Sequence, residues 1–136
     1  MVSILILSML ISTSGATQEL RTVWSGVYTA AQAARGAALY ERTCAECHGP
    51  ELEGGETAPP LAGPDFRWTW NGLSVGDLFE RLRISMPEGR PQSLSRREKA
   101  DILAYMFEQN TFPIGNTELH DRTEPLRTIR IDAVEP

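Results

Sequence analysis

Cysteine, basic charge and long apolar runs are all scarce in this sequence of 136 residues. The net charge of −5 and the pI of about 5.0 disfavour nucleic acid as a partner, because a protein that neutralises phosphates normally has a basic face. The apolar stretch at Val2–Ile11 is too short to cross a bilayer, which takes a helix of about 20 residues. With 41% hydrophobic and 23% charged residues, the composition predicts one globular domain with its own core.

The N-terminal segment has the pattern of a secretory signal peptide, in which an apolar stretch is followed by small residues. Ser14 and Ala16 occupy the −3 and −1 positions of a cleavage site, so residues 1–16 are predicted to be removed after export to the periplasm. The segment lacks the Lys or Arg that usually precedes the apolar stretch. It is therefore also consistent with a weak anchor that associates the protein loosely with the membrane, or with a buried N-terminal strand or helix.

Three segments have the polar caps and apolar periodicity of α-helices. They are expected from Ala30 to about Arg42, from Ser74 to Met86, and from Ser95 to about Gln109. The first should begin with a full capping box, in which the Thr29 hydroxyl and the Gln32 side chain each satisfy a backbone donor. Gly36 lies inside this helix, where glycine costs about 1 kcal/mol relative to alanine, so we expect another element to approach the bare backbone there.

Two stretches between and after these helices lack helical periodicity. Residues 49–64 are dense in Gly and Pro and predict an ordered loop. Residues 111–136 contain Pro and Gly turns followed by four apolar residues, Leu126, Ile129, Ile131 and Val134. This tail either folds back over the domain as an extended strap or frays, as chain termini often do.

The two cysteines lie in one short motif, TCAECHG at residues 43–49, with His48 directly after the second. A disulfide between Cys44 and Cys47 would close a very small loop and stabilise little. A thioredoxin-like redox pair belongs next to a βαβ pattern, whereas this segment is helical. A structural zinc site needs four ligands, and only His120 could be added to these three.

Covalent attachment of haem explains the motif better, since C-x-x-C-H is the signature of c-type haem. Residues at i, i+3 and i+4 of one helical turn share a face. Both thiols can therefore form thioether bonds with the two haem vinyl groups while the His48 imidazole binds iron from the same side. The motif, the export signal and the helical context point independently to haem c.

The sixth iron ligand decides between electron transfer and chemistry at an open position. Three side chains are candidates. Met106 lies on the apolar stripe of a helix, where methionine usually fills the core, and His120 lies in the tail, where a histidine is usually solvated. Met86 lies in a break between two helices beside Pro87, which prevents helical continuation, and is therefore the preferred ligand.

These motifs resemble those of the class I c-type cytochromes over residues 26–110, which leaves residues 111–136 as a C-terminal extension. The resemblance covers CAECH, the loop PPLAG at 59–63, the distal segment MPEGRPQSLS and the residues ILAY at 102–105. It implies an all-α cytochrome c fold, in which three main helices and their loops surround one covalent haem. The N- and C-terminal helices would cross, with Ile102 and Tyr105 meeting Gly36 and Tyr40.

The resemblance also implies the residues that hold the haem. Cys44 and Cys47 would carry the thioether bonds, and His48 and Met86 would be the axial ligands of the iron. The Pro59 carbonyl would accept the Nδ1 hydrogen bond of His48, which orients the ring.

Other residues would contact the porphyrin. Leu61 would line the haem edge. Trp68 or Trp70 would bond a haem propionate, with Arg67 as an alternative partner. Either tryptophan could equally cover the core, because a buried indole N–H seeks a partner in any fold.

The resemblance implies an electron carrier rather than an enzyme. Such a carrier passes single electrons between a redox protein donor and acceptor and has no small-molecule substrate. The segments ISMPEGRPQSLS and NTFPIGNTEL are most similar to cytochromes associated with periplasmic quinoprotein dehydrogenases. Such a dehydrogenase is the implied donor, and a terminal oxidase the implied acceptor. Two alternatives stay open. The first is a subunit permanently docked in a dehydrogenase or respiratory complex, with residues 111–136 as the docking strap. The second is a haem enzyme or gas-binding protein with an open distal position.

Overall fold

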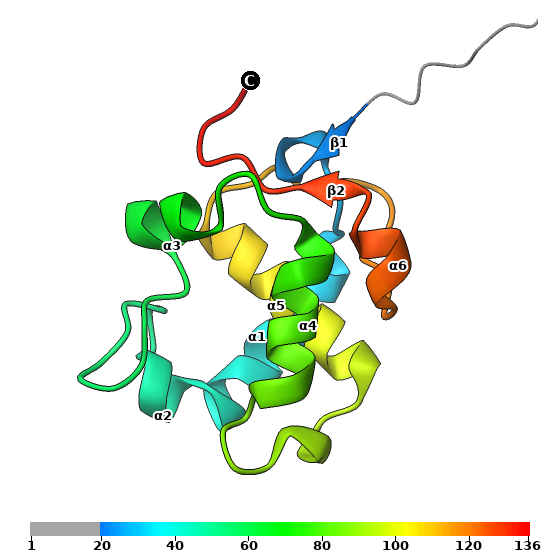
Figure 1. Ribbon diagram of the computed structural model, residues 1–136. Helices are drawn as coiled ribbons and strands as arrows, with labels where there is room; N and C mark the ends of the chain where they lie inside the picture. Colours follow the sequence, from blue (N-terminus) through cyan, green and yellow to red (C-terminus); the bar gives the residue numbers. More distant parts are fainter. Residues whose placement is uncertain (1–19) are drawn as a thin grey trace, which may run out of the picture.

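The computed structural model describes residues 20–136, and the predicted signal peptide at residues 1–16 lies outside this range. The elements, in chain order, are β1 (Arg21–Thr22), α1 (Ala30–Thr43), α2 (Ala45–His48), α3 (Gly63–Trp70), α4 (Val75–Ser85), α5 (Arg96–Gln109), α6 (Thr123–Leu126) and β2 (Ile129–Arg130), with short 3-10 turns at Val23–Ser25 and Pro91–Ser93. Figure 1 shows α1 and α5 crossing at the centre, with α4 in front of them and α2 and α3 on one side. The predominantly helical architecture is as predicted.

The three long helices begin where polar caps place them. The hydroxyls of Thr29, Ser74 and Ser95 each accept a hydrogen bond from the backbone N–H three residues later. Full capping boxes form at Ser74 and Ser95. Of the capping box predicted at Thr29, the bond to the Thr29 hydroxyl forms, but the predicted bond from the Gln32 side chain is wrong. That side chain lies in the core and bonds the backbone of Leu119 instead.

The crossing of α1 and α5 forms the centre of the core. An added Cβ at Gly36 would overlap the backbone carbonyl of Asp101, so the two helices approach this closely only because residue 36 has no side chain. Beside that contact, the rings of Tyr40 and Tyr105 lie with their centroids 5.4 Å apart. The predicted crossing of the N- and C-terminal helices, with Gly36 at the contact, is confirmed.

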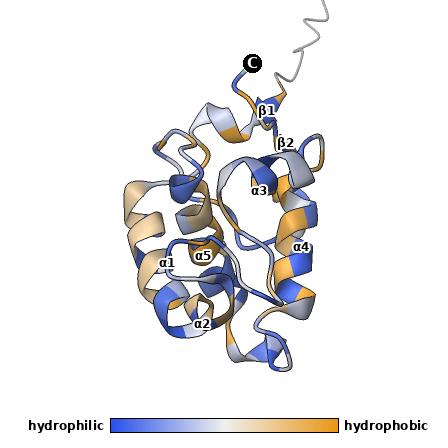
Figure 2. Cartoon of the chain, turned by 90° about the vertical axis from the view of Figure 1, so that its left-hand side faces the viewer, coloured by the Kyte–Doolittle hydropathy of each residue, from blue (hydrophilic) through white to orange (hydrophobic). Residues whose placement is uncertain are grey.

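α4 covers this crossing with one face. Leu78 and Phe79 are buried, and hydrophilic residues alternate with hydrophobic ones along α4, as the colouring in Figure 2 shows. This division of apolar and polar faces is the 3.6-residue pattern seen in the sequence. No helix within residues 20–136 is long and apolar enough to cross a membrane.

α3 is a helix that the sequence did not predict, because residues 59–64 have the composition of a Gly- and Pro-rich loop. Pro64 lies in the first turn of α3, where its missing N–H leaves no helical hydrogen bond unmade. The helix buries Phe66, which packs against Trp70 with ring centroids 6.5 Å apart. Proline therefore begins a helix here rather than preventing one.

Residues 111–136 fold back across the helices as a strap, which is the first of the two predicted alternatives. β2 pairs in parallel with β1, and Ile131 exchanges backbone hydrogen bonds with Gly72 and Leu73. The apolar residues Leu126, Ile129 and Ile131 are buried, whereas Val134 is 63% exposed.

Polar contacts also join the strap to α1 and α4. Thr123 bonds Glu80, and Arg127 pairs with Asp77 at 2.7 Å, so that α6 packs on α4. Gln32 of α1 donates to the Leu119 carbonyl at 3.1 Å and accepts from the Leu119 N–H at 2.8 Å. The strap is therefore held by buried apolar contacts and by polar contacts with two helices.

Candidate functional site

Cys44 is the junction between α1 and α2. Its N–H donates to the Tyr40 carbonyl at 2.8 Å and so ends α1, while its carbonyl accepts from the His48 N–H at 2.9 Å and so begins α2. The motif is therefore one helical turn, in which residues at i, i+3 and i+4 share a face. Gly49 follows at φ +84°, a conformation that favours glycine, and lets the chain turn away after the histidine.

The His48 imidazole is held in one orientation by the loop that follows. Its Nδ1 atom lies 2.9 Å from the Pro59 carbonyl oxygen. A carbonyl oxygen can only accept, so Nδ1 carries the proton and the free lone pair is on Nε2. This tautomer binds a metal through Nε2, and the bond to Pro59 makes the ring a stronger donor. It is the contact that the family resemblance implies.

Asn110 holds the same loop from the other side. Its buried side chain donates from Nδ2 to the Leu61 carbonyl at 3.0 Å, and its Oδ1 accepts from the Gly63 N–H at 3.1 Å. The Gly54 N–H also donates to the His48 carbonyl at 2.7 Å. Together these bonds fix the position of the Pro59 carbonyl. Sequence reasoning missed this role, since Asn110 was predicted only as a helix end and its side-chain partners are 47 and 49 residues away.

Both thiols are available for covalent bonds. Cys44 is half-buried, Cys47 is exposed, and no disulfide joins them. Burial raises the pKa of the Cys44 thiol, and a contact with Thr43 Oγ1 at 3.3 Å opposes that rise. In the part of the chain that the structure describes, no three His, Cys, Asp or Glu side chains are grouped to hold a metal ion. Two free thiols and one imidazole on a single helical turn are the donor set that covalent attachment of haem requires.

Met86 is the sixth-ligand candidate that lies neither in the core nor in open solvent. α4 ends at this residue, whose N–H donates to the Leu82 carbonyl at 3.1 Å and whose backbone is extended. The residue is half-buried. Figures 1 and 2 both place this end of α4 at the same end of the molecule as α2. Met86 thus stays the predicted sixth ligand.

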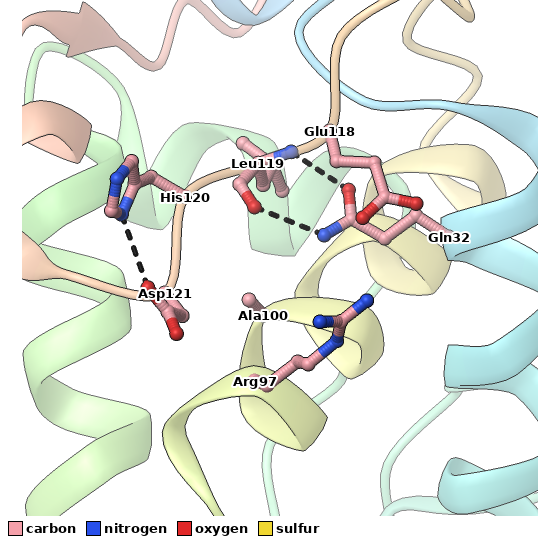
Figure 3. A pocket seen from close by; sticks show the side chains of 7 residues that line it. All are labelled: Gln32, Arg97, Ala100, Glu118, Leu119, His120 and Asp121. Carbon is pink, nitrogen blue, oxygen red and sulfur yellow. Dashed lines mark hydrogen bonds and ion pairs between the residues drawn. The ribbon is translucent and has the colours of Figure 1, made fainter.

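The other two candidates have different surroundings. Met106 is 3% exposed in the core along α5, as expected of a methionine that fills space. His120 is exposed on the strap beside a pocket that Gln32 and Arg97 also line, and its Nδ1 lies 3.2 Å from the Asp121 carboxylate (Figure 3). Met106 therefore has a packing role, and His120 lies at the surface beside Asp121.

The predicted contacts of the porphyrin lie on α3 and on the loop before it. Arg67 donates to the Asn110 carbonyl at 3.4 Å. Trp68 is 62% exposed, whereas Trp70 is half-buried against the core. Leu61 is also half-buried against the core. Their contacts with a haem and its propionates stay predictions.

Acidic side chains are concentrated around the motif. Five glutamates and one arginine lie between residues 41 and 56, and all five glutamates are exposed. They are Glu41, Glu46, Glu51, Glu53 and Glu56. This part of the surface is therefore strongly negative.

Known proteins share this part of the sequence. The family described as cytochrome C oxidase, cbb3-type, subunit III, matches residues 31–106. The thiosulfate dehydrogenase of Stutzerimonas stutzeri (strain A1501) is 34% identical over 79 residues, and that of Thiomonas intermedia (strain K12) is 37% identical over 81 residues. These alignments cover 54% and 55% of this chain but 26% of each relative, so the chain spans about a quarter of the length of these curated relatives.

A solved structure shares the fold. A chain in the crystal structure of the sulfane dehydrogenase SoxCD from Paracoccus pantotrophus aligns with a TM-score of 0.54 and 20% sequence identity, over 93% of this chain and 67% of that chain. This likeness confirms the predicted all-α fold, and the family match confirms a cytochrome c with haem c as its cofactor. With its motif turn, oriented histidine and crossing helices, this chain belongs to the family described as cytochrome C oxidase, cbb3-type, subunit III, and is a c-type cytochrome domain.

Proposed function

We propose that this chain carries single electrons on one haem c, bound covalently through Cys44 and Cys47, with His48 and Met86 as the axial iron ligands. The observation that carries the proposal is the orientation of His48. Its Nδ1 lies 2.9 Å from the Pro59 carbonyl, and His48 shares one helical turn with two free thiols. That bond leaves Nε2 as the ligating atom. A disulfide or a dithiol redox pair at the two cysteines would leave this orientation of His48 unexplained.

Some of these residues would bind the haem, and one would orient an iron ligand. When bound, haem c supplies a reversible one-electron couple. Cys44 and Cys47 would anchor it, the Pro59 carbonyl orients His48 so that Nε2 is free to ligate the iron, and Met86 would supply the second protein ligand. With His48 and Met86 both bound to the iron, no position would be left for a substrate, and the chain would act as a carrier rather than as an enzyme.

We infer that the partners are larger redox proteins in the periplasm, a dehydrogenase as donor and a terminal oxidase as acceptor. The exposed glutamates between residues 41 and 56 favour a partner with a basic surface, since complementary charge speeds encounter. The sequence resemblance favours a quinoprotein dehydrogenase as donor. The names of the relatives, thiosulfate dehydrogenase and sulfane dehydrogenase, favour a donor that oxidises a sulfur compound.

Visible spectroscopy of the mature holoprotein tests the iron ligands. We expect the α-band of haem c after reduction and a methionine-to-iron charge-transfer band after oxidation. Met86→Ala should abolish the charge-transfer band while the haem is retained, and Met106→Leu should leave the band in place. An unchanged band in Met86→Ala would remove Met86 from the iron. Rapid binding of carbon monoxide by the reduced protein would favour the alternative with an open distal position.

A second candidate is a haem-bearing electron-transfer subunit that stays docked in a dehydrogenase complex. It is favoured by the alignments, in which a segment like this chain makes up 26% of each thiosulfate dehydrogenase. Within the strap, Leu126, Ile129 and Ile131 are already buried against this chain, whereas Ile114 and Val134 are exposed and could contact a partner. Purification of the tagged chain from its natural host should then retain a dehydrogenase at high salt. Recovery of the cytochrome alone under those conditions would dispose of this candidate.

A further inference from the structure

Lys99 is the one lysine in the sequence, and it is buried. The other basic residues are arginines, whereas Lys99 on α5 is 2% exposed. Burial of an amine is unfavourable unless its N–H groups are hydrogen-bonded. A lysine that lies in the core of the molecule must therefore have specific acceptors.

The acceptors of Lys99 are two backbone carbonyls on either side of Met86. Its Nζ donates to the Arg83 carbonyl at 2.8 Å and to the Pro91 carbonyl at 2.6 Å. Arg83 lies in the last turn of α4, and Pro91 begins the turn Pro91–Ser93. One side chain from α5 thus ties together both ends of residues 83–91, which we call the Met86 segment.

The bond to Arg83 replaces one that the helix cannot make. In a continuing α-helix the Arg83 carbonyl would accept from the N–H of residue 87, but residue 87 is a proline and has none. Lys99 supplies the missing donor. A cationic group is also favoured at the C-terminal end of a helix. Burial, and then the nearby Arg83 and Arg96, lower the pKa of Lys99.

The remaining hydrogen bonds of the Met86 segment are local. The Met86 N–H donates to Leu82, and the Arg90 N–H donates to the Pro87 carbonyl at 3.0 Å. Within the residues that the structure describes, the hydrogen bonds from Lys99 are those that connect this segment to another helix. Its position relative to the core therefore depends on that side chain.

We propose that Lys99 is the positioning residue of the Met86 segment, which it holds so that the Met86 sulfur stays on the iron. The proposal rests on the proposed function, because Met86 is an iron ligand only there. Lys99 itself touches neither the iron nor the porphyrin in this assignment. It acts through the backbone on both sides of the ligand.

The test compares Lys99→Met with Gln32→Met in the oxidised holoprotein. Methionine keeps most of the length and apolar volume of lysine but donates no hydrogen bond. Gln32 is a matched control, because it is also buried and also makes two hydrogen bonds to backbone, at Leu119 of the strap. Both substitutions should lower stability in denaturant.

The readout that separates them is the affinity of the ferric protein for added imidazole, which competes with Met86. We expect Lys99→Met to bind imidazole roughly tenfold more tightly and to weaken the charge-transfer band, since the segment opens more readily. Gln32→Met should leave both unchanged. Equal imidazole affinity in Lys99→Met and the unmutated protein, or an equal rise in Gln32→Met, would overturn the proposal.

The double variant with Met86→Ala separates this proposal from the one on which it rests. Where Met86 is the ligand, Met86→Ala alone loses the band and Lys99→Met then adds no further affinity. A band that persists in Met86→Ala overturns the iron ligand itself. A band that disappears there while Lys99→Met changes nothing overturns only the positioning role.

A further test uses the unmutated protein, so it does not require any variant to fold. Because the chain has one lysine, amine acylation can modify only Lys99 and the N-terminus, and mass spectrometry distinguishes them. Lys99 should resist acylation in the folded holoprotein and react once the protein is denatured. Rapid acylation of Lys99 in the folded protein would overturn its place in the core.

Discussion

The His48 side and the Met86 side of the site are held in different ways. On the His48 side, the motif turn and the loop to Gly63 are close in sequence: the Gly54 N–H donates to the His48 carbonyl, and the His48 ring bonds the Pro59 carbonyl. On the Met86 side, an extended segment leaves α4 and is held by one side chain from α5. The His48 side keeps several other bonds when one is removed, whereas the Met86 segment depends on Lys99 for its hydrogen bonds to another helix. We therefore expect the Met86 side to open first, as regions with few tertiary contacts do.

Replacing both thiols gives the largest expected effect and is confined to the His48 side. Cys44→Ser with Cys47→Ser removes both thioether bonds, so the denatured protein should be colourless and have the mass of the apoprotein. Mass spectrometry after denaturation measures this. Thr43→Ser, next to the motif, should keep the haem mass. Haem that stays bound to the double variant in denaturant would contradict the assigned attachment.

Asn110→Ala should have a smaller effect, again on the His48 side. It leaves the Leu61 carbonyl and the Gly63 N–H without their partner, which should lower the unfolding free energy by about 1–3 kcal/mol. Denaturant unfolding of the holoprotein measures the loss. The charge-transfer band should remain, since Met86 is not touched.

A matched control for that substitution is Asn71→Ala. Asn71 is exposed and accepts one hydrogen bond, from the Ala133 N–H at 2.8 Å, so a smaller loss is expected. If Asn110→Ala removed the charge-transfer band, the two sides of the site would not be independent.

Acid should lower the unfolding free energy through Glu80, on the Met86 side of the site. This is the smallest of the expected effects. The hydrogen bond from Arg83, and next that from Thr123, lower the pKa of Glu80 from 4.5 to about 2. Since the folded pKa lies below the unfolded one, this stabilisation is complete above about pH 4.5 and is lost as the pH falls towards 2. For a partly exposed pair we expect less than about 1 kcal/mol.

The measurement is the unfolding free energy at pH 6 and at pH 3. The decrease between them should be smaller in Glu80→Gln than in the unmutated protein. Glu56→Gln, at an exposed glutamate in the loop, should leave the decrease unchanged. An equal decrease in Glu80→Gln and the unmutated protein would show that this pair does not contribute to acid sensitivity.

Local patterns predicted much of the fold. The starts of α1, α4 and α5 follow from Ser or Thr caps that bond the N–H three residues later, and such bonds form wherever the helix forms. Glycine destabilises a helix interior, so Gly36 was predicted to lie where another backbone approaches. The backbone of Asp101 lies against it. The motif turn is local for the same reason, since its hydrogen bonds span four residues.

The partners of buried polar side chains were not predictable in the same way. Gln32 matched a capping box but bonds Leu119, and Asn110 matched a helix end but holds the loop before α3. These bonds join residues 47 to 87 positions apart. Nothing in a local window distinguishes such a partner from solvent, because burial is decided by how the elements pack.

By itself, the sequence determined that two thiols and an imidazole share one helical turn, because residues three and four apart on a helix must lie on one face. It also determined that α4 could not continue past Met86, since Pro87 has no N–H to donate. Only the tertiary structure decided that the Pro59 carbonyl orients His48 and that Lys99 holds the Met86 segment. Those contacts exist because chain segments meet in the folded core, where a buried polar group must be bonded and packing selects its partner.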